Sequence, residues 1–115
     1  MTSVVIPWRS GCPYRQRALV WVLGRWAERF PTFDVVLGVH DDGPWCKAAA
    51  VADGLSKVAD GALILADADV WPLRPEALTV AVGALSGYGW AIPPGDVRRL
   101  TETASEAFMA DQPLP

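Results

Sequence analysis

The stretch Gly61–Trp71, GALILADADVW, decides the fold. Its apolar run, residues 62–66, contains only small or branched side chains, and Asp67 and Asp69 follow it directly. Such a run is typical of a strand buried on both faces of a parallel sheet. Because open α/β sheets bind ligands at the carboxyl ends of their strands, a site is expected at the two aspartates. Carboxylates there hold a hard divalent cation that clamps a diphosphate, or else they are solvated residues that begin a turn.

Three further runs predict strands on either side of this stretch. Ser3–Ile6, SVVI, is β-branched and is ended by Pro7, and Asp34–His40, DVVLGVH, leads into the turn signal of residues 41–44. A fourth strand is predicted over Trp90–Pro93, after the glycines near residue 88.

Segments with helical spacing follow each of these strands. They are predicted to run from Pro13 to Phe30, from residue 45 to near residue 60, from Pro75 to Leu85, and from a cap at Asp96 through Phe108. The alternation of strands and helices indicates one α/β domain, residues 1–115. Its sheet is expected to be mainly parallel and Rossmann-like, with right-handed crossovers and helices on both faces. The pattern leaves the strand order open.

The overall composition excludes several classes of protein. Hydrophobic residues make up 51% of the chain and charged residues 20%, which is typical of a globular domain. The net charge of −3 and the scattered basic residues argue against a nucleic-acid partner. No run approaches the ~20 apolar residues of a transmembrane helix, and the N-terminus lacks a signal-peptide pattern, so a cytoplasmic location is expected. Cys12 and Cys46 are then reduced thiols, and with His40 as the single histidine a zinc site is disfavoured.

Polar groups follow three of the predicted strands at their carboxyl ends. The three segments are Pro7-Trp8-Arg9, His40-Asp41-Asp42 and Asp67-Ala68-Asp69. Acids beside an arginine suit a phosphorylated ligand held through a cation. Lys47, in the first turn of the second predicted helix, adds a positive charge at a helix end that itself favours anions.

These segments resemble a known family. VVIPWR (4–9), DVVLGVHDDGPWCKAAAVADG (34–54) and GALILADADVWP (61–72) are similar to the N-terminal, donor-binding half of GT-A fold glycosyltransferases, of the family 2 and galactosyltransferase-like type. The last segment matches their metal-binding Asp-x-Asp motif, and the resemblance extends from Val4 to about Leu100. It implies a strand order of 2-1-3-4 and a nucleoside-diphosphate sugar, UDP- or GDP-linked, as the ligand.

The resemblance also implies roles for individual residues. The donor-binding residues would be Pro7, Trp8, Arg9, Asp41, Asp42, Lys47, Asp67 and Asp69. Pro7 and Arg9 would lie against the nucleoside, and Asp42, or alternatively Asp41, would contact the base. Trp8 either lines this pocket or fills space beneath a loop.

The phosphate end of the donor is assigned in the same way. Lys47 would approach the phosphates, and Asp67 would contact the ribose and stand beside the metal. Asp69 would bind the Mn²⁺ or Mg²⁺ that bridges the diphosphate. In enzymes of this family the metal would offset the charge that develops on the leaving nucleoside diphosphate.

The chain departs from the family pattern in two ways. Asp53 stands where many relatives carry asparagine, and the chain has about half the usual length of the catalytic domain, so the acceptor half is expected to be absent. No residue after Asp69 is an obvious general base. A minimal or truncated glycosyltransferase is therefore expected, completed by a partner or by self-association. The alternative is a non-catalytic nucleotide-sugar binding module. A phosphatase of the haloacid dehalogenase type is disfavoured because its motif lies on the first strand, with threonine or valine where this chain has Trp71.

Overall fold

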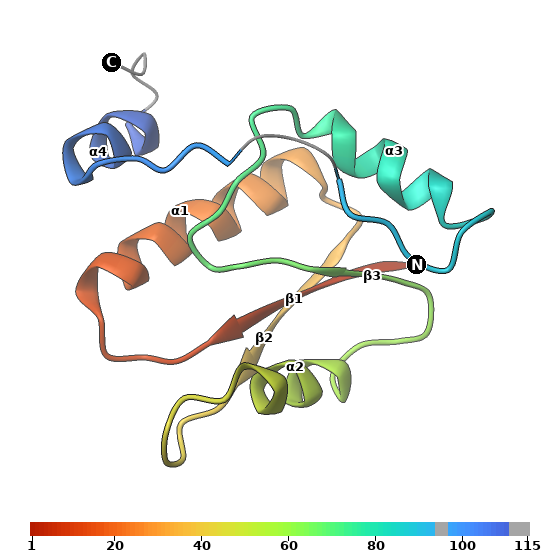
Figure 1. Ribbon diagram of the computed structural model, residues 1–115, viewed down its shortest axis with the longest axis horizontal. Helices are drawn as coiled ribbons and strands as arrows, with labels where there is room; N and C mark the ends of the chain where they lie inside the picture. Colours follow the sequence, from red (N-terminus) through yellow and green to blue (C-terminus); the bar gives the residue numbers. More distant parts are fainter. Residues whose placement is uncertain (94–96, 111–115) are drawn as a thin grey trace.

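The computed structural model describes residues 1–93 and 97–110, in which strands and helices alternate through most of the chain (Figure 1). The strands are β1 (Thr2–Trp8), β2 (Asp34–Val39) and β3 (Ala62–Leu65), and the helices are α1 (Pro13–Arg29), α2 (Lys47–Leu55), α3 (Glu76–Ala84) and α4 (Glu102–Met109). The strands form an open parallel sheet in the order β2-β1-β3. The α/β class, the parallel pairing and the relative order of these three strands are confirmed.

Helices cover both faces of the sheet, as predicted, because β1 is apolar on both sides (Figure 1). Alternate residues of a strand point to opposite faces. Val4, Ile6 and Trp8 share one buried cluster with Leu19, Val22 and Trp26 of α1 and Leu78 of α3. On the opposite face, α2 lies so close to the sheet that a Cβ atom added at Gly54 would meet the side chain of Val5.

A proline explains where β3 leaves the sheet. The Ala66 N–H donates to the Val5 carbonyl over 3.1 Å, the last bond of this parallel ladder. The next bond would need an N–H on Pro7, which has none. Pairing between β1 and β3 therefore stops, although β1 continues beside β2 to Trp8, and Asp67 and Asp69 turn away from the sheet.

The fourth predicted strand is not formed, and that prediction is wrong for residues 90–93, which have no regular structure. Gly89 and Pro93 leave only three residues between them, too few for a ladder, and Pro93 has no N–H to donate. Trp90 and Ile92 are each 75% exposed.

The predicted helix boundaries also need correction. The last helix is capped by Thr101, whose Oγ1 accepts the Ala104 N–H over 3.1 Å, whereas the predicted cap, Asp96, lies outside the described residues. The second helix is shorter than predicted, because it begins at Lys47 and ends at Leu55.

An aromatic cluster anchors the segment that follows β3. The Trp71 ring lies edge-on to Trp26, with ring centroids 5.1 Å apart, and edge-on to Trp21 at 6.4 Å. This contact ties the chain after Asp69 to α1, so the Asp67–Asp69 turn is held from both of its ends. Within the described ranges, no helix is both long and apolar enough to cross a membrane.

Candidate functional site

The carboxyl ends of the three strands lie at one edge of the sheet, because the strands are parallel and adjacent. The segments that leave this edge begin at Arg9, at His40 and at Ala66. Helix α2 also begins there, with Lys47 as its first residue. The structure therefore brings together the three segments and the helix end for which the sequence pattern predicted a phosphate-binding site.

The Asp67–Asp69 turn exposes both of its carboxylates. Ala68 between them is 5% exposed and belongs to the core cluster with Ile6 and Trp8. Because its small side chain points inward, the aspartates on either side are left in solvent. This arrangement presents two carboxylates at the end of β3 on a turn that is anchored by packing.

Lys47 contacts one of these carboxylates. Its Nζ lies 2.9 Å from Asp67 Oδ1, and the two side chains are 59% and 53% exposed. An ion pair this exposed contributes about 0–1 kcal/mol to stability and is screened by salt. It joins the start of α2 to the end of β3, which are 20 residues apart in the chain, without contributing much to stability.

Arg9 binds the backbone of the loop that follows β2. Its Nη2 donates to the Gly43 carbonyl over 2.5 Å and, more weakly, to the Asp41 carbonyl over 3.4 Å. Gly43 has a φ of +66°, a conformation that a side chain would strain. The side chains of Asp41 and Asp42 remain exposed on this loop.

Pro7 and Trp8 occupy a different environment from the other predicted site residues. Both are buried at the end of β1, and Trp8 is 8% exposed within the core cluster. Of the two roles considered for Trp8, the structure shows the packing role. The other six predicted site residues are charged: Arg9 is half-buried, and five are exposed, namely Asp41, Asp42, Lys47, Asp67 and Asp69.

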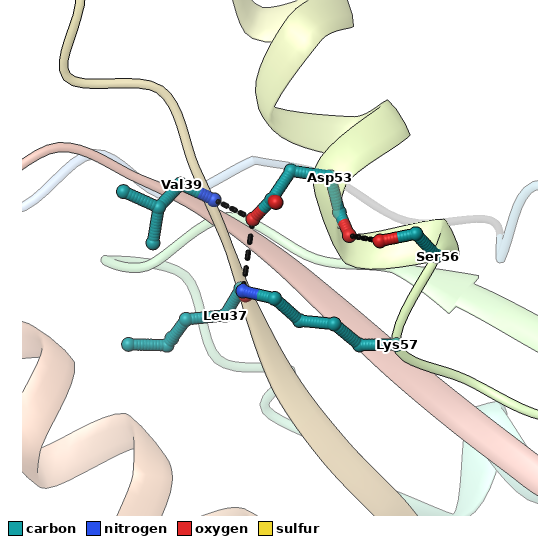
Figure 2. Close-up of polar contacts among 5 residues, drawn as sticks. All are labelled: Leu37, Val39, Asp53, Ser56 and Lys57. Carbon is teal, nitrogen blue, oxygen red and sulfur yellow. Dashed lines mark hydrogen bonds and ion pairs between the residues drawn. The ribbon is translucent and has the colours of Figure 1, made fainter.

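Sequence reasoning missed the polar cluster centred on Asp53 (Figure 2). Asp53 Oδ2 accepts the Val39 N–H over 2.8 Å and lies 2.8 Å from Lys57 Nζ, which in turn donates to the Leu37 carbonyl over 2.9 Å. The Asp–Lys spacing of four residues was a visible signal for the ion pair. Nothing in the sequence indicated that both side chains reach the backbone of β2.

The contacts of Asp53 change its acidity. The hydrogen bond from the Lys57 ammonium, with the Val39 N–H and the charge of Lys57 in addition, lowers the pKa of Asp53 below its ordinary value of 3.8, although partial burial opposes this. The carboxylate therefore stabilises the fold above pH ~3.8, and this stabilisation is lost as the pH falls through the lowered pKa.

We predict that wild type loses more of its free energy of unfolding between about pH 5 and pH 3 than Asp53→Asn does, because asparagine does not titrate. Urea unfolding of both proteins across this range measures the difference, which should shrink in high salt because the pair is partly exposed. Parallel pH profiles for the two proteins would contradict the prediction.

The chemistry available at this edge fits a hard cation shared with a ligand. In residues 1–93 and 97–110, no three or more His, Cys, Asp or Glu side chains come together as a metal-binding group. Asp67 and Asp69 alone offer the one or two carboxylates that Mg²⁺ takes from proteins when phosphate oxygens and water complete its shell. His40 is half-buried, with its ring centroid 6.5 Å from that of Trp45.

Two open grooves lie along α1. Their volumes are about 510 and 470 Å³, and Trp21 lines both. None of the eight predicted donor-binding residues lines either groove. The predicted site is therefore an exposed edge of the sheet and does not coincide with these hollows.

Comparison of the chain with protein-family models, with curated proteins and with solved structures finds no match.

Proposed function

We propose that this chain binds a nucleoside-diphosphate sugar, UDP- or GDP-linked, through a divalent cation at the carboxyl edge of its sheet, as the donor-binding part of a metal-dependent glycosyltransferase of the GT-A type. The observation that carries the proposal is the meeting of Lys47 and Asp67 at that edge, 2.9 Å apart. The ammonium of Lys47 and the carboxylate of Asp67, from two different elements, meet beside a second exposed carboxylate, that of Asp69, as a metal-bridged diphosphate would require.

The ion pair suggests how the ligand enters. In the protein alone, the Lys47 ammonium neutralises Asp67. A diphosphate offers Lys47 a stronger partner at the N-terminus of α2, where helix N–H groups also favour anions. Asp67 would then be free to contact the ribose and, with Asp69, to hold the divalent cation, which would supply positive charge beside the diphosphate.

The nucleoside would lie over the ends of β1 and β2. Asp41 and Asp42 present exposed carboxylates on the loop after β2, and carboxylates accept hydrogen bonds from base N–H groups. Arg9 contacts this loop through the Gly43 carbonyl, and Pro7 lies two residues before Arg9, in β1. Asp42 remains our favoured contact for the base.

A second candidate is binding without transfer. Among the described residues, no third carboxylate or imidazole joins the Asp67–Asp69 pair as a group, and no general base is assigned. In the transferase proposal, the acceptor side is supplied by a partner or by a second copy, and the exposed Leu65, Val70 and Leu73 beside the site favour such a contact.

The proposal also includes a cytoplasmic location, supported by the free thiols of Cys12 and Cys46.

The test is calorimetric titration of UDP, GDP and their sugar conjugates, with and without Mn²⁺, into wild type, Asp69→Ala and Asp60→Ala. Asp60 is an exposed aspartate before β3, so its replacement changes the net charge equally, away from the site. Asp69→Ala should weaken metal-dependent binding about 10- to 100-fold, the loss of one charge-assisted contact or more. Asp60→Ala should bind like wild type.

Two outcomes decide between the candidates. If wild type is folded and binds none of these compounds, the donor-site proposal fails. If it binds a donor but neither transfers nor hydrolyses the sugar, the binding-module candidate is favoured.

A further inference from the structure

The loop after β2, residues 40–43, is held at both ends by side chains from other elements. At its start, the Val39 N–H donates to Asp53 Oδ2, which belongs to α2 (Figure 2). At its far end, Arg9 Nη2 donates to the Gly43 carbonyl over 2.5 Å. These two bonds fix a loop whose exposed side chains, Asp41 and Asp42, face solvent.

The Asp53–Lys57 pair bonds to β2 as a neighbouring strand would. In a parallel ladder, one residue of the next strand donates to the carbonyl of one residue and accepts the N–H two residues later. Lys57 Nζ donates to the Leu37 carbonyl over 2.9 Å, and Asp53 accepts the Val39 N–H over 2.8 Å. The pair therefore satisfies both groups at the outer edge of β2, where the sheet has no further strand among the described residues.

Helix α2 has little freedom to shift relative to β2. A Cβ atom added at Gly38 would meet the backbone carbonyl of Ala50, and one added at Gly54 would meet Val5. Because the helix backbone lies directly on the sheet, Asp53 is held in register with Val39. Lys47 at the other end of the same helix contacts Asp67, so one rigid helix joins the loop after β2 to the aspartates after β3.

We propose that Asp53 is a positioning residue for the 40–43 loop: with Lys57 as its partner it fixes the end of β2, and with Arg9 at the far end it sets where Asp41 and Asp42 stand. Base selectivity then depends on Asp53, which does not touch the ligand, and this consequence rests on the proposed donor site. Arg9 acts through the loop backbone as well.

The carboxylate matters because it accepts from two donors at once. The amide of an asparagine in its place would keep an oxygen for the Val39 N–H but would lose the charge that holds Lys57. Alanine would remove both contacts. The effects of Asp53→Asn and Asp53→Ala should therefore be graded, and Lys57→Met should resemble Asp53→Asn, since each retains the bond to Val39.

The first experiment is amide hydrogen exchange in the protein without ligand. At Val39, whose N–H Asp53 accepts, and at the loop amides that follow it, Asp53→Ala should exchange about 3- to 10-fold faster than wild type, the effect of one lost hydrogen bond, and Asp53→Asn should be intermediate. Residues 62–65 of β3 should be unchanged, and Asp60→Ala serves as the control with the same change in charge. The proposal would be overturned if amide exchange at Val39 and in the loop were as slow in Asp53→Ala as in wild type. It would also be overturned if exchange were accelerated equally across the whole sheet.

The second experiment compares the affinities for UDP and GDP in the same variants. Asp53→Ala should change the ratio of the two affinities by about 3-fold or more, and Asp53→Asn should restore part of it. General loosening of the fold would weaken both nucleotides equally. If wild type binds the nucleotides and Asp53→Ala leaves the ratio of the UDP and GDP affinities unchanged, the role of Asp53 in selectivity is overturned and the donor site stands. A wild type that binds neither nucleotide overturns the donor site, and hydrogen exchange then decides the positioning role by itself.

Discussion

Replacing Trp26 with alanine is expected to lower the free energy of unfolding by about 3–5 kcal/mol, the usual cost of removing a buried large aromatic side chain. Trp26 is 2% exposed and is among the largest fully buried side chains. Its ring contacts Phe30 and Trp71, with centroids 5.5 and 5.1 Å away. The loss would be a large share of the ~5–15 kcal/mol that stabilises a typical domain.

Urea unfolding followed by far-ultraviolet circular dichroism measures this loss without relying on the removed fluorophore. Trp90→Ala is the matched control, since Trp90 is 75% exposed and its loss should change stability by less than about 0.5 kcal/mol. Trp26→Phe should cost less than alanine, because it keeps a ring and removes an indole N–H that has no hydrogen-bond partner in the described residues. Equal effects at positions 26 and 90 would show that the cluster is not the core.

Gly38→Ala is expected to destabilise the protein by about 3 kcal/mol, at the upper end of the range for overpacking. The added Cβ would meet the carbonyl oxygen and carbon of Ala50 and the nitrogen of Gly54, all of them backbone atoms of α2. No side chain can rotate to relieve this contact, so the helix itself must move away from β2. Its displacement would also separate Asp53 from Val39 and Lys47 from Asp67.

Gly24→Ala is the control for this substitution. Gly24 lies within α1, and nothing stands within 4 Å of an added Cβ. Alanine there should stabilise the protein by about 0.5–1 kcal/mol, because glycine loses more backbone freedom in a helix. Opposite signs for the two substitutions in thermal unfolding would demonstrate the close packing of α2. A stabilising Gly38→Ala would contradict it.

Several residues of the candidate site were predictable because their signals are local. Asp67 and Asp69 follow a buried strand, and Lys47 opens a helix, so their positions follow from the βα pattern. The Asp53–Lys57 cluster was missed because its partners, Leu37 and Val39, lie up to 20 residues away in the chain. The backbone contacts of Arg9 were missed for a similar reason, since the carbonyls that it binds are 32 and 34 residues away.

The sequence by itself determined the alternation of strands and helices and the parallel character of the sheet. These features follow from runs of apolar side chains, from their spacing, and from prolines and glycines, all of which act over a few residues. It did not determine the extent of the sheet, because an apolar run such as residues 90–92 forms a strand only if a neighbouring strand offers hydrogen-bond partners.

Only the tertiary structure decided which side chains meet. Trp8, the last residue of β1, packs into the core, while the Asp67 carboxylate, two residues after β3, is 53% exposed beside Lys47. It also decided that Asp53 and Lys57 of the α2 region provide hydrogen-bond partners for the outer backbone groups of β2. The physical reason is that burial and hydrogen bonding depend on distances across the fold, and those are set only when the helices settle on the sheet.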